Sequence, residues 1–128
     1  MTMKIRSLKR TSSGRENIRE RILEAREMSI GRASSCDLEL SALTISLEHA
    51  LIKQGESGNV SFNLLNDSQA MVNGRLMSGR SMDLNLGDTL RLGPYALTVE
   101  TPDKSDEFIL TFEQVEADDV VVSGKDET

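Results

Sequence analysis

The sequence has few of the residues that mark metal-binding, disulfide-rich or membrane-spanning proteins. It contains one cysteine, Cys36, and one histidine, His49, which excludes an internal disulfide framework and a His-rich metal site. No apolar run approaches the roughly 18–20 residues of a membrane span, and the first ten residues lack the apolar stretch of a secretory signal. We therefore expect a cytoplasmic protein with no cofactor and no membrane insertion.

Aromatic residues are also scarce, at 3% of the chain. The formal net charge of -6 is unevenly spread, because residues 1–32 are basic and residues 101–128 are acidic. A basic segment can meet phosphates, but here glutamates interrupt the arginines and few aromatic rings are present for bases to stack on. We expect no nucleic-acid partner.

The length of 128 residues fits one globular domain, and 38% hydrophobic and 28% charged residues are ordinary for a folded chain. Glycines and Asn/Asp/Ser clusters cut its middle into short segments. The pattern predicts strands within residues 44–52, 60–64, 70–72, 89–92, 95–99 and 108–115. Asn73-Gly74 is a strong hairpin-turn signal. Many short strands with close turns predict an all-β sandwich.

One segment near the N-terminus permits two interpretations. Ile18, Ile22 and Ala25 have helical spacing, whereas residues 21–24 and 27–30 also suit the two strands of a hairpin, which we favour. For the domain organisation we expect a flexible basic arm or a first edge strand in residues 1–16, the domain in residues 17–116, and an acidic flexible tail or linker in residues 117–128.

Four short motifs occur together in one order. They are Ile30-Gly31-Arg32, Ser46-Leu47-Glu48-His49, Val72-Asn73-Gly74 and Gly87-Asp88. In this order and spacing, from about residue 18 to residue 100, the chain resembles the forkhead-associated (FHA) domain. The resemblance implies a SMAD/FHA-type β-sandwich of about eleven short strands. It also implies that loops at one end bind phosphothreonine-containing segments of partner proteins, in signalling or assembly.

The chemistry of such a site identifies the first candidate residues. A phosphothreonine carries about -1.5 to -2 charges and three acceptor oxygens, so its pocket needs a guanidinium and a hydroxyl donor on rigid loops. Arg32 and Ser46 suit these roles, and Gly31 would let the chain turn sharply and aim Arg32. The resemblance implies a structural role for His49, Asn73 and Gly74. We expect no enzyme, because side chains three residues apart on a strand, such as Ser46 and His49, point to opposite faces.

The sequence departs from the family's pattern at three further site positions. Leu47 stands where the family has Arg or Asn, and Asp67 and Ser68 fall on the positions of a phosphate-supporting Thr and a peptide-holding Asn, unless a small loop shift brings Asn66 into play. A carboxylate about 4 Å from a like charge is disfavoured by on the order of 4 kcal/mol at an effective dielectric constant of about 20. If Asp67 faces the pocket, it can pair with Arg32 and occupy the anion site itself. If Asp67 faces water, its repulsion of a bound phosphate is mostly screened.

These departures leave two functions open. The first is a phosphothreonine-binding module whose peptide contacts are Arg32, Ser46, Leu47, Asp67 and Ser68. The alternative is a degenerate FHA domain that serves as a phosphate-independent scaffold, which an exposed apolar patch at Leu47 or an Arg32–Asp67 ion pair would favour. A third hypothesis is that hydroxyls in residues 11–13, which follow two basic residues, are phosphorylated and dock into the loop site.

Overall fold

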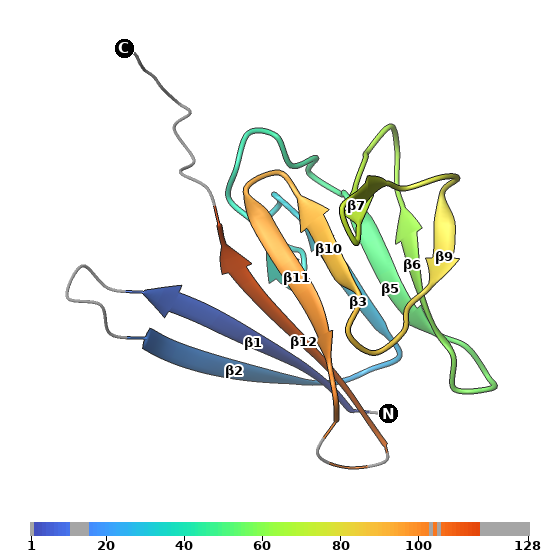
Figure 1. The fold of residues 1–128 in the computed structure, drawn as a ribbon. Helices are drawn as coiled ribbons and strands as arrows, with labels where there is room; N and C mark the ends of the chain where they lie inside the picture. The colour runs from blue at the N-terminus through green and yellow to red at the C-terminus, as the bar shows by residue number, and fades with distance from the viewer. Residues whose placement is uncertain (1, 11–15, 103, 105, 116–128) are drawn as a thin grey trace.

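The structure, a computed structural model, describes residues 2–10, 16–102, 104 and 106–115. Within these residues it contains strands and no helix, so no helix long and apolar enough to cross a membrane occurs there (Figure 1). The acidic tail of residues 117–128 and the hydroxyls of residues 11–13 lie outside the described residues.

In the described part of the chain, twelve strands form two sheets that pack face to face (Figure 1). The all-β sandwich expected from the sequence is confirmed, with one strand more than the approximate number. The seven-stranded sheet has the order β2-β1-β12-β11-β10-β7-β8, and the five-stranded sheet has the order β4-β3-β5-β6-β9. The strands are β1 (Thr2–Arg10), β2 (Glu16–Glu24), β3 (Glu27–Gly31), β4 (Leu38–Glu39), β5 (Ala50–Gln54), β6 (Val60–Leu64), β7 (Met71–Val72), β8 (Arg75–Leu76), β9 (Ser81–Asp83), β10 (Thr89–Leu92), β11 (Tyr95–Glu100) and β12 (Glu107–Gln114).

The core lies between the two sheets and is built from side chains at every second position of a strand, because these point to the same face. In β6, Val60, Phe62 and Leu64 are buried, whereas Ser61 and Asn63 between them are half-buried. Each large apolar side chain that is fully buried stabilises the fold by about 1.5–3 kcal/mol. The largest fully buried side chains are Phe62, Met3, Met28, Ile30, Leu40, Ile45, Ile52, Leu90, Leu92, Leu97, Ile109 and Leu110.

The N-terminal segment is part of the seven-stranded sheet. Of residues 1–16, expected as a flexible arm or an edge strand, Thr2–Arg10 form β1, which lies between β2 and β12 and runs parallel to β12. Burial of Met3 and Ile5 against the core holds it there, and on the outer face Lys4 Nζ lies 2.9 Å from a carboxylate oxygen of Glu107.

The ambiguous segment forms strands, but they do not pair with each other. β2 pairs with β1, whereas β3 pairs with β4 and β5, so Ala25 and Arg26 carry the chain from one sheet to the other. Leu23 packs against the core, whereas Ile18 and Ile22 point to the exposed outer face. The expected hairpin of residues 21–30 is therefore wrong, because both strands bury their apolar faces against the same core from opposite sheets.

The Asn73-Gly74 turn joins β7 to β8 as the sequence predicts. Both residues have positive φ, 51° and 86°, which a two-residue hairpin turn requires. The Asn73 side chain also accepts a hydrogen bond from the backbone N–H of Thr89 at 2.9 Å and donates one to Asp88 at 3.0 Å. This motif therefore fixes the β7–β8 hairpin to β10.

Candidate functional site

Two loops meet at one end of the sandwich, and we call them loop 40–49, between β4 and β5, and loop 65–70, between β6 and β7. Hydrogen bonds join them: the backbone N–H of Leu65 donates to the carbonyl of His49 at 2.9 Å, and the Asn66 side chain donates to the carbonyl of Glu48 at 3.0 Å. Asn66 has a positive φ of 56°, a conformation that Asn tolerates better than most residues. The two loops are therefore joined by one hydrogen bond between backbones and one from a side chain to the backbone.

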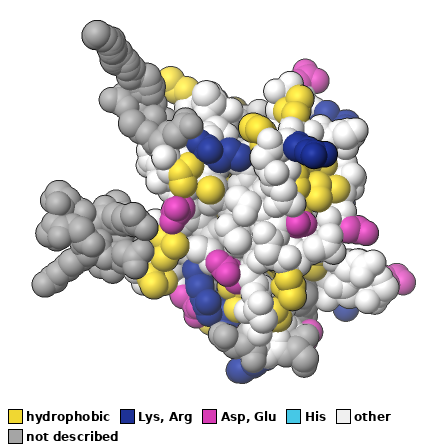
Figure 2. Space-filling view, viewed as in Figure 1, with side chains coloured by type: hydrophobic (Ala, Val, Ile, Leu, Met, Phe, Trp, Pro, Cys, Tyr) yellow, Lys and Arg dark blue, Asp and Glu magenta, His cyan; other side chains and the backbone are white. Residues whose placement is uncertain are grey.

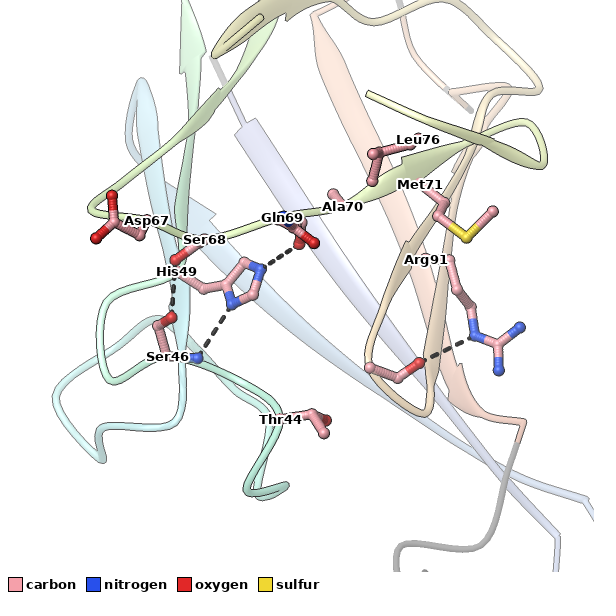
Figure 3. Close-up of a pocket in the computed structure, with 11 residues that line it drawn as sticks. Thr44, Ser46, His49, Asp67, Ser68, Gln69, Ala70, Met71, Leu76 and Arg91 are labelled. Carbon is pink, nitrogen blue, oxygen red and sulfur yellow. Dashed lines mark hydrogen bonds between the residues drawn. The ribbon is translucent and has the colours of Figure 1, made fainter. Parts of the chain in front are cut away.

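His49 forms the centre of this connection (Figure 3). The residue is 3% exposed, and Nδ1 of its ring accepts a hydrogen bond from the backbone N–H of Ser46 at 3.1 Å. Because Nδ1 is an acceptor, Nε2 carries the proton and donates to the carbonyl of Gln69 at 2.7 Å. Burial lowers the pKa of His49, although the hydrogen bond to Gln69 opposes this shift. His49 thus acts as a neutral link between the two loops.

The hydroxyl of Ser46 is oriented by a hydrogen bond from Ser68. Ser68 is buried, and its Oγ donates to Ser46 Oγ at 2.8 Å (Figure 3). Ser46 accepts this bond, so its own hydroxyl hydrogen can be donated to an outside acceptor. The sequence placed Ser68 among the peptide contacts; in the structure Ser68 lines the same cavity as Ser46, and its hydroxyl donates a hydrogen bond to the Ser46 hydroxyl.

Arg32 follows β3 and lies against loop 40–49. Its backbone N–H donates to the carbonyl of Ser46 at 2.9 Å, and its side-chain Nε donates to the carbonyl of Ile45 at 3.0 Å. Within the described part of the chain this is the only hydrogen bond of the guanidinium, which leaves both terminal nitrogens available to an anion. The structure therefore brings Arg32, which follows β3, next to Ser46 of loop 40–49.

Gly31 is needed for a reason different from the expected sharp turn. A Cβ at Gly31 would lie 2.9 Å from the carbonyl carbon of Leu47 and would overlap the carbonyl oxygen. Positive φ is found at other glycines among the described residues, not at Gly31. Gly31 thus allows loop 40–49 to pack directly on the end of β3.

The two residues that raised doubt about a phosphate site both point outward. Asp67 is exposed at the rim, and its carboxylate is directed away from Ser46 (Figure 3). Among the described residues, no ion pair joins Asp67 to Arg32. The Leu47 side chain is 56% exposed, while its carbonyl accepts hydrogen bonds from the backbone N–H of Ala33 and from the thiol of Cys36.

A cavity of about 420 Å³ opens between the two loops and the β10–β11 hairpin (Figure 3). Its lining residues are Thr44, Ser46, His49, Asp67, Ser68, Gln69, Ala70, Met71, Leu76, Arg91 and Gly93. Arg32 is not among them, so the cation in the cavity wall is Arg91, whose Nε donates to the carbonyl of Gly93 at 3.1 Å.

Sequence reasoning missed Thr44, Gln69, Met71, Leu76 and Arg91. Only Arg91 had a usable signal, since it lies between the buried Leu90 and Leu92 and must point to the opposite face. No group of three or more His, Cys, Asp or Glu side chains suited to a metal ion occurs in the part of the chain that is described. The hydroxyl and guanidinium donors suit an anion, and the open cavity beside them suits an extended segment.

Comparisons with known proteins agree with this geometry. A family model described as FHA domain matches residues 28–93, whereas no curated protein sequence matches the chain. Among solved structures, Mycobacterium tuberculosis EmbR in complex with a low-affinity phosphopeptide has 24% identity and a TM-score of 0.59, over 75% of this chain and 27% of that one. The N-terminal FHA domain of S. cerevisiae Rad53p in complex with a phosphothreonine peptide has 20% identity and a TM-score of 0.52, over 85% and 87%. The chain thus spans about a quarter of the EmbR chain, and these similarities establish the fold.

Proposed function

The chain belongs to the FHA domain family, and we propose that it is a non-enzymatic interaction module that binds phosphothreonine-containing segments of partner proteins. The observation that carries this proposal is the attachment of Arg32, which follows β3, to the backbone of Ile45 and Ser46 in loop 40–49, with donors still available on Arg32 and Ser46. The outward direction of Asp67 supports it, because the chain's own carboxylate does not occupy the anion site (Figure 3). EmbR and Rad53p, which share the fold, were solved with phosphopeptides.

Binding in this proposal uses donors that are already in position. The phosphate would accept from the Ser46 hydroxyl and from the terminal nitrogens of Arg32. The bond from Ser68 polarises the Ser46 hydroxyl and strengthens its donation, because linked hydrogen bonds reinforce one another. His49 fixes the backbone of Ser46, so the loop loses little conformational entropy when the peptide binds.

The affinity of this site is expected to be modest. A micromolar complex corresponds to about 8 kcal/mol, and one charge-assisted hydrogen bond contributes roughly 1.5–3 kcal/mol. Leu47 and Asp67 remove two such contacts relative to the family's pattern. We therefore expect dissociation constants that approach the millimolar range.

The test is a titration of the protein with phosphothreonine peptides and their unphosphorylated counterparts, followed by NMR chemical shifts. The phosphorylated set should bind at least about tenfold more tightly, and Arg32→Ala and Ser46→Ala should remove this difference. Arg26→Ala is the matched control, since Arg26 is exposed and lies outside the cavity. Equal binding of both peptide sets by the unmodified protein would contradict the proposal.

A second candidate is phosphate-independent binding to a protein surface. It is favoured by Leu43 and Leu47, which are 91% and 56% exposed on the loop that also carries Ser46. In this case Leu47→Ser weakens partner binding, whereas removing the phosphate has no effect. The same titration therefore separates the two functions.

A further inference from the structure

In the part of the chain that the structure describes, the edge strands of the two sheets differ greatly in length. β4, β8 and β9 end the sheets with two or three residues each, whereas β2, the fourth edge, has nine (Figure 1). The backbone N–H and C=O groups on the free side of an edge strand can pair with another strand, and natural proteins usually keep such edges short. β2 contains no proline, and its pairing with β1 runs without a bulge. β2 is therefore the edge best suited to add a further strand.

The outer face of β2 carries two exposed apolar side chains. Ile18 and Ile22 are 63% and 56% exposed, although both are large. Glu20 lies midway between them on the same face, because side chains at every second position of a strand share a face. Figure 2 shows yellow hydrophobic side chains directly beside dark-blue and magenta charged ones on the left of the molecule, where β1 and β2 lie in Figure 1. The edge thus offers apolar contacts as well as backbone pairing.

The spacing of these residues fits a second copy of β2. When two identical strands pair antiparallel about a two-fold axis, the register that overlaps all nine residues of β2 places Glu20 on the axis. In this register Ile18 lies opposite Ile22 of the second copy, and Ile22 lies opposite Ile18. A shift of the strand by two residues in either direction would place each isoleucine opposite a glutamate instead. One register is therefore favoured over its neighbours.

We propose that two copies of this chain associate through β2, which pairs antiparallel with β2 of the second copy and joins the two seven-stranded sheets into one. The contacts are the backbone hydrogen bonds of the paired edges and two Ile18–Ile22 pairs, one on each side of the axis. This inference does not depend on phosphothreonine binding.

The charge at the centre of the proposed interface is compensated within each copy. Glu20 would face Glu20 of the second copy, and like charges directly opposite each other disfavour strand pairing. Each Glu20 carboxylate oxygen, however, lies 2.7 Å from Nε of Arg6 on β1. Two neutral ion pairs, and not two isolated carboxylates, would therefore meet at the axis.

The inner face of the edge is balanced in the same way. There Arg19 would lie opposite Arg21 of the second copy. Both arginines line a cavity of about 330 Å³ that Asp37 and Glu39 also line, and the backbone carbonyl of Asp37 accepts a hydrogen bond from Arg21. Each copy thus brings two acidic side chains beside its two guanidinium groups.

The first experiment is disulfide cross-linking of single cysteine variants under oxidising conditions. Residues directly opposite each other have Cβ atoms about 4.5–5.5 Å apart, close to the separation in a disulfide. Glu20→Cys should therefore form a covalent dimer on its own, whereas Glu24→Cys, on the same face of the same strand, should not. The unmodified protein, whose Cys36 is buried, should run as a monomer on a non-reducing gel. Cross-linking of Ile18→Cys or Ile22→Cys in place of Glu20→Cys would contradict the register.

The second experiment measures association without a covalent bond. In sedimentation velocity the mass of the unmodified protein should rise from monomer to dimer with concentration, over a range that covers micromolar to millimolar dissociation constants. The double variant Ile18→Thr, Ile22→Thr keeps strand-forming residues and should associate roughly five- to tenfold more weakly. Leu76→Thr is the matched control and should associate like the unmodified protein, since Leu76 has the same 63% exposure as Ile18 but lies on β8, at the other edge of the sheet.

Three outcomes overturn the inference. The first is a monomer at every concentration without cross-linking of Glu20→Cys, and the second is an equal loss of association in Leu76→Thr. The third is a larger dimer fraction for a fragment of residues 1–116 than for the full chain, which would make the acidic residues 117–128 the occupant of the edge. All these measurements are made without peptide, so equal binding of phosphorylated and unphosphorylated peptides refutes the proposed function alone.

Discussion

At the loop end of the sandwich, one backbone carbonyl group holds loop 40–49 against the segment that follows β3. The carbonyl of Leu47 packs on Gly31 and also accepts hydrogen bonds from Ala33 and Cys36. Burial raises the pKa of the Cys36 thiol, although a hydrogen bond with the Ala33 backbone opposes the shift, so the thiol stays protonated and remains a donor. Changes at these residues therefore move loop 40–49, whether or not they touch a ligand.

Gly31→Ala should destabilise the protein by about 1–3 kcal/mol, because the new methyl group overlaps the Leu47 carbonyl. Urea unfolding measures the effect. Gly55→Ala is the control, since its Cβ would lie 3.6 Å from the carbonyl oxygen of Asn59, an ordinary contact. Equal stabilities of the two variants would show that loop 40–49 does not need the close approach.

Leu47→Arg should strengthen phosphopeptide binding by roughly tenfold, because a guanidinium at this exposed position adds a charge-assisted contact to the phosphate. Titration with the phosphorylated and unphosphorylated peptides measures the gain. Leu47→Gln, which adds polarity without charge, should gain little. A gain for both peptides alike would place the effect outside the phosphate site.

Stability should decrease as the pH falls below about 6.5, the ordinary pKa of histidine. The lowered pKa of His49 means that the unfolded chain binds a proton that the folded chain excludes. The contribution of His49 is complete above this pH and is lost as the pH falls toward the lowered pKa, with a slope of at most about 1.4 kcal/mol per pH unit. Urea unfolding between pH 5.5 and pH 8 measures it, and since His49 is the single histidine, His49→Gln should flatten the profile.

At the scale of elements, the sequence predicted strands and turns that depend on neighbouring residues, but it did not predict which strands pair with each other. The alternation in residues 60–64 and the Asn73-Gly74 signal predict β6 and the β7–β8 turn because neighbouring residues determine both. The pairing of β2 with β1, in contrast, depends on which sheet each apolar face joins.

The same distinction explains which residues of the candidate site could be found from the sequence. Arg32, Ser46 and His49 are found from short motifs, whereas Met71, Leu76 and Arg91 become neighbours only through the register of three strands. Such contacts have no local signal in one sequence. Gly31 was identified for the wrong physical reason, since its contact with Leu47 is also long-range.

Asn73→Ala should destabilise the β7–β8 hairpin and the protein by about 1–3 kcal/mol, because Ala disfavours positive φ and leaves the backbone N–H of Thr89 without its acceptor. Thermal unfolding measures the loss. Asn73→Gly is the informative comparison, since it relieves the backbone strain but still lacks the side-chain bonds. If both variants matched the original stability, neither contribution would be significant.

At the scale of the whole molecule, the fold extends beyond the residues that the family model matches. β1, β2 and β12 lie outside residues 28–93, yet they form one side of the seven-stranded sheet and supply Met3, Ile5 and Leu110 to the core. We propose that the folding unit includes residues 2–10, in place of the boundary at residue 17 suggested by composition.

A fragment of residues 17–116 should therefore not unfold cooperatively. It lacks β1, so β12 loses its parallel partner and the core loses Met3 and Ile5, worth about 1.5–3 kcal/mol each against a typical total of about 5–15 kcal/mol. Differential scanning calorimetry measures the transition. A fragment of residues 1–116 is the control and should keep it, whereas equal behaviour of both fragments would restore the boundary at residue 17.

The parallel pairing of β1 with β12 places the ends of the described chain at opposite poles of the sandwich. Thr2 pairs with Glu107, whereas Val115 donates its backbone N–H to Pro94, next to the cavity residue Gly93 (Figure 1). A fluorophore or sensor-chip anchor attached ahead of residue 2 would leave the cavity beside Ser46 unobstructed. Anything fused after residue 115 is attached close to this cavity, where tethering raises its effective concentration enough to compete with a weakly bound ligand.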